Sequence, residues 1–291
     1  MQQDFVAPPD EVVTGLVADV LRAAGESDDP TRWRRIEHGS ANLVILAGRV
    51  AVRVSRTPAA AAEAVRAQRL IDLLPPLPFA LPRSVAAPAH AGQIVAIAQE
   101  RVAGEPHPSG SGDGAQLRRL LDAVREVPLA PLAPHLAHRD AYLGGGAWRG
   151  ILTDRVIPLL DPAAQARARA AADALAALDA APELFTHGDL AGANVMWSGG
   201  AVSAVIDWDL AAADDESKDV AALATWHGWN ALAGIVPSET LARARTIAAT
   251  YPLQLVSFAV VGARPQAEID RAVARANNRY ADASASSAAR S

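Results

Sequence analysis

The chain has 291 residues, enough for one large domain or two modest ones with a buried core. A net charge of −5 gives no electrostatic footprint for nucleic acid, and the absence of cysteine excludes disulfides, thiolate metal sites and cysteine nucleophiles. No apolar run reaches the ~18 to 20 residues of a membrane span, and the first residues lack a signal-peptide pattern, so we expect a cytoplasmic protein without a membrane partner.

The first hundred residues predict a small, β-rich region. Apolar side chains from Val12 to Leu21 follow helical spacing, which favours an amphipathic helix over residues 10–24. Residues 42–56 predict two strands joined at Ala47–Gly48, and a helix follows from Pro58 to Leu74. Another strand is predicted over residues 93–102. Together these elements predict an N-terminal nucleotide-binding lobe of residues 1–98.

The segment 103–114, "AGEPHPSGSGDG", is the strongest composition break in the chain and indicates a lobe boundary. We place a hinge at residues 99–105 and a C-terminal catalytic and substrate-binding lobe at residues 106–291. That lobe predicts helices over 115–127 and 161–180, the second capped by Asp161 with Pro162 in its first turn. Two short strands, 193–197 and 201–208, flank a tight turn, and the tail 281–291 is expected to fray.

Three polar residues lie at the ends of these two strands. Asp189 and Asn194, in "HGDLAGANVMW", precede the first strand, and Asp207, in "IDWD", ends the second. Each alone fits an ordinary turn residue. Together they fit phosphoryl transfer, in which a carboxylate takes the proton of the acceptor hydroxyl and Mg²⁺ neutralises the phosphates. The spacing favours Asp189 as the base and Asn194 and Asp207 as metal ligands.

The order of elements and the stretches "HGDLAGANV" and "IDWD" resemble the aminoglycoside phosphotransferase family from about Ile36 to Leu223. The resemblance implies an α+β, bilobal protein-kinase-like fold. It also implies that His187 shapes the catalytic loop and that Asp215 and Asp219 brace the lobe. The run "DDESKD" lacks the family's glycine and proline, so Asp215 is the weaker match.

A second stretch, "HRD" at residues 138–140, is closer in its letters to the protein-kinase catalytic loop. Its fifth following position is Gly145, which offers no oxygen for a second metal. We interpret it as a loop or a helix end.

On the nucleotide side, "EHGSANLVIL" matches the family's phosphate-covering loop, with Gly39, Ser40 and Asn42 at the matched positions. A Gly-Ser pair is also an ordinary hairpin turn. The strand "VAVRV" puts Arg53 where kinases carry the phosphate-binding lysine. Because the only lysine in the chain is the distant Lys218, Arg53 is the candidate for this role. Guanidinium binds phosphate oxygens in a bidentate manner, although a strand arginine can also face solvent.

Two further predictions concern the donor site. Glu63 is the nearest acidic residue on the following helix for pairing with Arg53, against the alternative of a solvated helix face. The stretch "IAQERVAGEP" resembles the hinge of the family, where backbone groups bind the nucleotide base, and this prediction covers Gln99, Glu100, Arg101 and Val102. Backbone contacts leave ATP and GTP equally possible as donors.

The acceptor site is less defined. Carboxylates are sparse after residue 220, which argues against a strongly acidic pocket for polycations. Trp226, His227 and Trp229 offer an apolar wall, although helix packing explains each of them better.

We therefore predict a small-molecule O-phosphotransferase that uses Mg²⁺ and ATP or GTP. "PLPFALP" is similar to macrolide phosphotransferases and "ALDAAPELFTHGDLAGANVMW" to viomycin phosphotransferases, so the expected acceptor is an antibiotic-type alcohol (aminoglycoside, macrolide or tuberactinomycin-like) and the expected outcome is resistance. A metabolic kinase for a sugar or amino alcohol shares every motif, and a catalytically dead nucleotide-binding module is a further alternative. The oligomeric state stays open.

Overall fold

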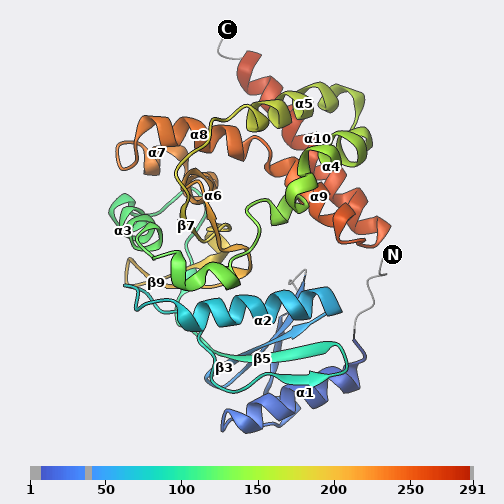
Figure 1. Ribbon diagram of the computed structural model, residues 1–291, viewed down its shortest axis with the longest axis vertical. Coiled ribbons are helices and arrows are strands. Elements are labelled where there is room, and N and C mark those ends of the chain that lie inside the picture. The colour runs from blue at the N-terminus through green and yellow to red at the C-terminus, as the bar shows by residue number, and fades with distance from the viewer. Residues whose placement is uncertain (1–7, 37–40, 289–291) are drawn as a thin grey trace.

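The computed structural model describes residues 8–36 and 41–288, with side chains to residue 281. At one end lies a five-stranded antiparallel sheet in the order β1-β2-β3-β5-β4 (Figure 1). Its strands are β1 (Arg34–Ile36), β2 (Asn42–Ala47), β3 (Val50–Ser55), β4 (Ala89–Ala91) and β5 (Ile94–Glu100). The hairpin β2–β3 and the strand β5 were predicted from sequence.

Two helices, α1 (Asp10–Ala23) and α2 (Pro58–Leu73), cover this sheet. The alternation of side chains along β3 sorts its residues by face. Val52 and Val54 join the buried cluster under α1, so Arg53 between them faces the opposite side, toward the rest of the molecule. Thr57 caps α2 by accepting the amide of Ala60 at 3.1 Å, and Pro58 occupies its first turn.

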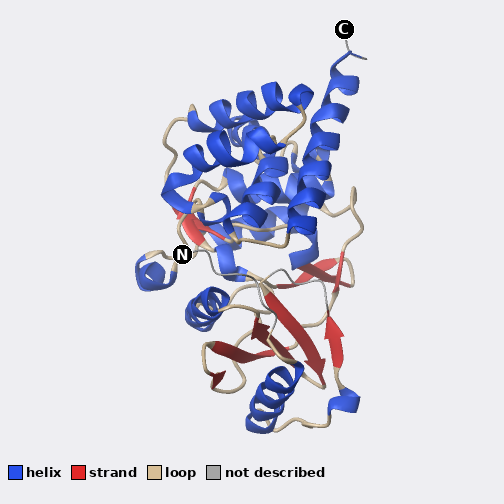
Figure 2. Cartoon of the chain, turned by 90° about the vertical axis from the view of Figure 1, so that its right-hand side faces the viewer, coloured by secondary structure: helices blue, strands red, loops and turns tan. Residues whose placement is uncertain are grey.

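The remainder of the chain is mostly helical (Figure 2). Its helices are α3 (Gly114–Arg125), α4 (Trp148–Ile151), α5 (Pro162–Ala176), α6 (Ser217–His227), α7 (Trp229–Leu232), α8 (Ser238–Ala248), α9 (Tyr251–Val261) and α10 (Gln266–Ala288). Two small sheets interrupt them, formed by β6 (Glu105–Pro106), β8 (Val195–Ser198) and β9 (Ala201–Val205), and by β7 (Leu184–Thr186) and β10 (Ala212–Asp214).

One hydrophobic core connects the two ends of the molecule. Leu70 and Ile71 of α2 belong to the same buried cluster as Leu117 of α3, Phe185 of β7 and Trp208 after β9. Helix α2 therefore packs on the sheet with one face and on the helical region with another. This arrangement holds the inner face of β3 opposite the loops that follow β7 and β9.

Two details differ from the sequence predictions. Helix α5 ends at Ala176, four residues before the predicted end. The tail was expected to fray, whereas α10 continues to residue 288 through alanine-rich sequence, which favours helix. Within the described residues no single helix is long and apolar enough to cross a membrane, and α8 and α9, bent by 46° at a short break, meet that test only as a pair.

Candidate active site

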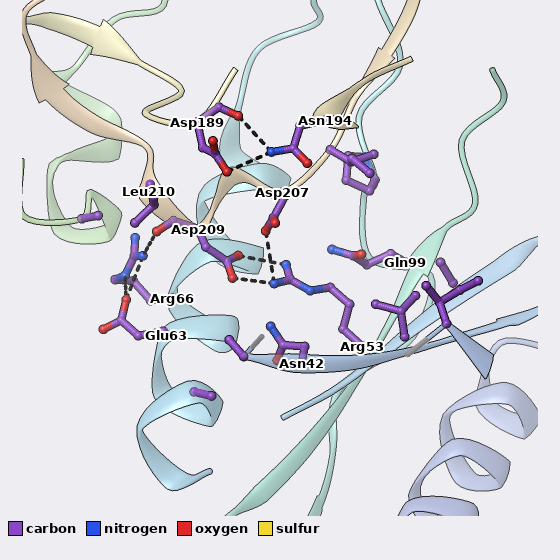
Figure 3. A pocket seen from close by; sticks show the side chains of 18 of the residues that line it. Asn42, Arg53, Glu63, Arg66, Gln99, Asp189, Asn194, Asp207, Asp209 and Leu210 are labelled. Carbon is purple, nitrogen blue, oxygen red and sulfur yellow. Dashed lines mark hydrogen bonds and ion pairs between the residues drawn. The ribbon is translucent and has the colours of Figure 1, made fainter. Parts of the chain in front are cut away.

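A cavity of about 1280 Å³ lies between the sheet and the helical region. Its lining includes Arg53 from β3, Gln99 from β5, and Asp189, Asn194 and Asp207 from the loops around β8 and β9 (Figure 3). The fold thus brings together side chains that are more than 150 residues apart in sequence.

The catalytic loop begins where β7 ends, and a carboxylate from α6 holds its backbone. Asp219 accepts the amide of His187 at 2.8 Å and that of Gly188 at 2.9 Å. Burial, together with the nearby carboxylates of Asp214 and Asp189, raises the pKa of Asp219 to about 7. Asp219 therefore braces the backbone of this loop.

The imidazole of His187 is fully buried and ties the catalytic loop to the segment after β9. Its Nε2 lies 3.0 Å from the carbonyl oxygen of Ile206, and its Nδ1 accepts the amide of Asp189 at 3.2 Å. Because a carbonyl oxygen only accepts, the proton resides on Nε2 and the ring is neutral. Burial lowers the pKa of His187 to about 4, which agrees with this tautomer. His187 is thus a positioning residue rather than an acid or base.

Asp189 and Asn194 are joined across the loop. The Nδ2 group of Asn194 donates to the backbone oxygen of Asp189 at 2.9 Å and to its Oδ2 at 3.0 Å. The amide nitrogen is thereby used, and Oδ1 of Asn194 is left as an acceptor for a cation. Burial raises the pKa of Asp189, which moves this carboxylate toward the range useful for a general base.

Asp207 follows β9 in an unusual backbone conformation. Its φ of 62° and ψ of 62° lie in the left-handed region, which costs a residue other than glycine roughly 1 to 2 kcal/mol. The amide of the preceding Ile206 donates to the oxygen of Asn194 at 2.9 Å. This strained turn places the Asp207 carboxylate in the cleft beside Asn194 and Asp189. Although half of the carboxylate is open to the cleft, the surrounding protein and the charge of Asp209 raise the pKa of Asp207 to about 6.

Arg53 crosses the cleft to meet this acidic segment. Its Nη1 and Nη2 donate to the two carboxylate oxygens of Asp209 at 2.9 and 2.5 Å, and Nη2 lies 3.5 Å from Asp207 Oδ1. The expected pairing with Glu63 is wrong. The Glu63 side chain is 62% exposed and binds Arg66, one turn further along α2. Glu63 reaches the rim of the cleft but not the guanidinium.

The remaining donor-site predictions have mixed outcomes. Gly39 and Ser40 lie outside the described residues. Asn42 lies in the cleft at the start of β2, where its buried Oδ1 has no hydrogen-bond partner among the described residues.

The predicted hinge residues Gln99, Glu100, Arg101 and Val102 all line the cleft. The amides of Glu100 and Arg101 already donate to the carbonyl oxygens of Arg83 and Arg49, at 2.8 and 2.9 Å. The side-chain amide of Gln99 donates to Gln68 at 2.6 Å. These three donors are therefore already used within the protein, and the binding of a nucleotide base by this segment stays a prediction.

The "HRD" stretch forms a turn outside the catalytic loop, as interpreted from sequence. Arg139 pairs with the buried Asp214 at 3.1 Å, and Lys218 pairs with both Asp214 and Asp140. Asp215 caps the start of α6 through the amide of Ser217 and pairs with Arg243, contacts that help to lower its pKa against the effect of burial. Asp215 therefore has a structural role despite the altered motif around it.

The aromatic residues Trp226, His227 and Trp229 pack against other parts of the chain and do not line the cleft. Trp226 donates to the oxygen of His107 at 2.8 Å, His227 bonds to the oxygen of Ser111, and Trp229 lies under the guanidinium of Arg245. After residue 220, the described lining of the cleft is Phe258, Val261, Gly262, Ala263 and Arg264.

Sequence reasoning missed this wall of the cleft. Phe258 stacks on Tyr142 with ring centroids 5.2 Å apart, and Arg264 lies over the Phe258 ring. Among the described residues of this wall, none is acidic. No local signal distinguishes Phe258 from a core residue of an apolar helix, because only the tertiary fold turns it toward the cleft.

The donor set at the floor of the cleft suits Mg²⁺. Asn194 and Asp207 offer amide and carboxylate oxygens, which together with nucleotide phosphates form the usual ligands of this ion. Asp189, Asp207 and Asp209 outnumber Arg53, so the floor carries excess negative charge. The described residues contain no cluster of three or more histidine, cysteine or acidic side chains that alone would hold a metal.

Comparison with known proteins agrees with this geometry. The chain matches the phosphotransferase enzyme family over residues 24–253. Viomycin phosphotransferase from Streptomyces vinaceus is 34% identical over 123 residues, which correspond to 38% of this chain and 42% of that enzyme. The match thus spans less than half the length of this curated relative.

Solved structures with the same fold cover nearly the whole chain. An aminoglycoside phosphotransferase in complex with GDP and kanamycin superimposes with a TM-score of 0.75 at 16% identity, covering 93% of this chain and 99% of that one. A macrolide 2′-phosphotransferase from Brachybacterium faecium superimposes with a TM-score of 0.67 at 22% identity, covering 89% and 97%. These identities show the fold alone. The family match covers most of the sequence, and the chain therefore belongs to the phosphotransferase enzyme family, with a bilobal, kinase-like α+β fold.

Proposed function

We propose that the protein transfers the γ-phosphoryl group of ATP or GTP to a hydroxyl group of an antibiotic-type small molecule. One observation carries the proposal: Asp189, Asn194 and Asp207 converge on the floor of a large cleft. The backbone amide of Ile206, which donates to the oxygen of Asn194, and the His187 imidazole, which bonds to the oxygen of Ile206, join their two segments. Arg53 reaches the same point from the opposite wall.

In this reaction the Asp189 carboxylate orients the acceptor hydroxyl and takes its proton. The hydroxyl oxygen forms a bond to the γ-phosphorus while the bond from that phosphorus to the β–γ bridging oxygen breaks, and the nucleoside diphosphate leaves. Asn194 holds the Asp189 carboxylate through its Nδ2 group at 3.0 Å. His187 fixes the loop that carries it, and Arg53 supplies positive charge for the donor phosphates. Bound at Asn194 and Asp207, Mg²⁺ would neutralise phosphate charge.

The named relatives support an antibiotic as the acceptor and leave the donor open. They comprise viomycin, aminoglycoside and macrolide phosphotransferases, solved in some cases with GDP and in another with AMP-PNP. Within the described residues, the cleft wall formed by Phe258, Val261 and Arg264 has no carboxylate. This wall favours an acceptor with few positive charges over a polycationic aminoglycoside.

A nucleotide-consumption screen tests the proposal. The protein is incubated with Mg²⁺, with ATP or GTP, and with an aminoglycoside, a macrolide, viomycin or a set of hydroxylated metabolites. The masses of the products are then measured by mass spectrometry. We expect acceptor-dependent nucleotide consumption and a product heavier by one phosphoryl group, both lost in Asp189→Asn. Phosphorylation of a metabolite but of no antibiotic would assign a metabolic kinase, and no acceptor-dependent consumption would contradict phosphotransfer.

A further inference from the structure

The carboxylate that holds Arg53 comes from the segment after β9 instead of from α2. We propose that Asp209 is a positioning residue that orients Arg53 for the phosphates of the donor nucleotide. This inference rests on the proposed phosphotransferase function. It gives a role to the second aspartate of "IDWD", which the catalytic motif leaves without one.

The geometry of the contact is that of a bidentate fork. Each carboxylate oxygen of Asp209 accepts one terminal nitrogen of Arg53, at 2.9 and 2.5 Å. Two parallel hydrogen bonds fix both the position and the plane of a guanidinium, which one bond to a lysine would not do. The fork uses two of the five N–H groups of Arg53, so others remain for phosphate oxygens.

The burial of the pair explains why the carboxylate is needed. Arg53 is only 9% exposed, and the Asp209 side chain is 22% exposed. A cation this deeply buried requires a counter-charge and hydrogen-bond acceptors. Asp207 lies 3.5 Å from the same nitrogen but is the proposed metal ligand. Asp209 is therefore the carboxylate that can stay with Arg53 while nucleotide and metal occupy the cleft.

Helix α2 contributes to the pair indirectly. Both acidic residues of α2 are engaged elsewhere, Glu63 with Arg66 and Asp72 with Ser84 and Gln68. Arg66 reaches from the helix to the carbonyl oxygens of Asp209 and His135. The helix thus secures the backbone of Asp209, and the Asp209 side chain in turn secures Arg53 (Figure 3).

A double-mutant cycle on nucleotide binding tests this role. Titration calorimetry measures the Kd of ATP and of GTP with Mg²⁺ for wild type, Asp209→Asn, Arg53→Ala and the double variant. We expect Asp209→Asn to raise the Kd by about tenfold or more, as for loss of a charged hydrogen bond, with the acceptor KM within about twofold of wild type. In the Arg53→Ala background the same change should have little further effect. Asp209→Glu, which keeps the charge, should recover part of the affinity.

Asp122→Asn is the matched control. Asp122 accepts Arg118 Nε through both oxygens and also pairs with Arg125, on α3 and outside the cleft. It should leave the nucleotide Kd unchanged. Thermal melting of each variant reports folding separately, and if Asp209→Asn does not fold, Asp209→Glu and Asp209→Ser are compared in its place.

Three results would overturn the assignment. If Asp209→Asn raised the nucleotide Kd by the same factor in the wild-type and Arg53→Ala backgrounds, Asp209 would act directly on the metal or the nucleotide. Tighter nucleotide binding by Asp209→Asn would mean that the fork withholds Arg53 from the phosphates. If the wild type binds nucleotide and Asp209→Asn binds it with the same Kd, Asp209 does not orient Arg53, and the proposed function is unaffected. A wild type that binds neither ATP nor GTP would contradict both the role of Asp209 and the proposed function.

Discussion

Asp219 on α6 accepts the backbone amide of His187 at 2.8 Å and, through its other oxygen, that of Gly188. One buried carboxylate therefore satisfies two consecutive amides of the catalytic loop. The position of the loop therefore depends in part on a residue that does not line the cleft. Asp219 thus holds the loop in place, whereas the proposed chemistry belongs to Asp189 on that loop.

Replacing Asp219 with asparagine should loosen the loop. The amide keeps one acceptor oxygen but turns its NH₂ group toward one of the two amides, leaving a buried donor without a partner. We expect a loss of about 1 to 3 kcal/mol in the free energy of unfolding, measured by urea denaturation, and a fall in kcat with little change in nucleotide Kd. An unchanged stability would show that the two hydrogen bonds contribute nothing net.

Gly188 requires its glycine for a steric reason. Its φ is +80°, and a Cβ there would lie 2.3 Å from the carbonyl oxygen of Leu210. Gly188→Ala should therefore cost more than the roughly 1 to 2 kcal/mol of left-handed strain alone and should inactivate the enzyme. Gly199→Ala is the control, because Gly199 has φ +59° with no atom within 4 Å of its Cβ position. Equal losses of unfolding free energy in the two variants would rule out the contact with Leu210.

His187 gives the stability a defined pH dependence. Its folded pKa of about 4 is below the unfolded value of 6.5, so the unfolded state binds more protons between these values. The contribution of His187 is complete above pH 6.5 and is lost as the pH falls toward 4, by up to about 3 kcal/mol. Asp219, whose pKa is raised, makes the stability change with pH in the opposite direction. Its effect is the same in wild type and in a His187 variant, so it cancels when the two are compared.

The measurement is the unfolding free energy of wild type and His187→Gln at several pH values. Glutamine can donate to the oxygen of Ile206 but does not titrate. The stability difference between the two proteins should therefore shrink from pH 7 to pH 4. A difference that stays constant over this range would show that His187 is not kept neutral by burial.

The sequence indicated that Asp189, Asn194 and Asp207 lie close together, and the structure places all three in the cleft; their catalytic roles stay predictions. Asp189 and Asn194 precede β8 and Asp207 follows β9. These two strands are joined by a tight turn, so a local hairpin brings the two segments together. The partner of Arg53 was not predictable in the same way. Glu63 is close in sequence but 62% exposed, while Asp209 is 156 residues away and reaches Arg53 only after α2 packs on both regions.

The cleft wall formed by Phe258, Val261 and Arg264 was also not predictable from local sequence. The aromatic residues Trp226, His227 and Trp229 are conspicuous in sequence yet bind the linker and α8, whereas Phe258 on the apolar helix α9 lines the cleft. The sequence did predict that the segment after residue 220 would bring few carboxylates to the cleft. This prediction needs only the composition of the segment and does not depend on which of its residues face the cleft.

The small number of carboxylates on this wall of the cleft predicts how acceptor binding responds to salt. Exposed opposite charges are screened by added salt, and the described wall with Phe258, Val261 and Arg264 offers no carboxylate to a cationic acceptor. The acceptor KM should change less than about threefold between low and high ionic strength. Steady-state kinetics at several KCl concentrations test this, and a steep loss of kanamycin binding with salt would reveal an acidic pocket.

Asp189 and Asp207 should have separable roles, because one addresses the acceptor proton and the other the metal. Asp189→Ala is expected to leave Mg²⁺-nucleotide affinity near normal while kcat falls by about 10² to 10⁴, the usual range for a positioned general base. Asp207→Ala is expected to remove the Mg²⁺ dependence of nucleotide binding. It also relieves Arg53 of one of its two carboxylates but keeps the fork to Asp209, so binding of the nucleotide without metal should persist.

Titration calorimetry with and without Mg²⁺, combined with kcat measurements, distinguishes the two variants. The double variant should lose less than the sum of the single losses, since both residues act on one transition state. Asn194 joins the two roles, because its Nδ2 binds Asp189 and its Oδ1 is left for the metal. Asn194→Ala should therefore show both defects, each weaker than in the aspartate variants. If Asp189→Ala lost metal-dependent binding while Asp207→Ala kept it, the assigned roles would be reversed.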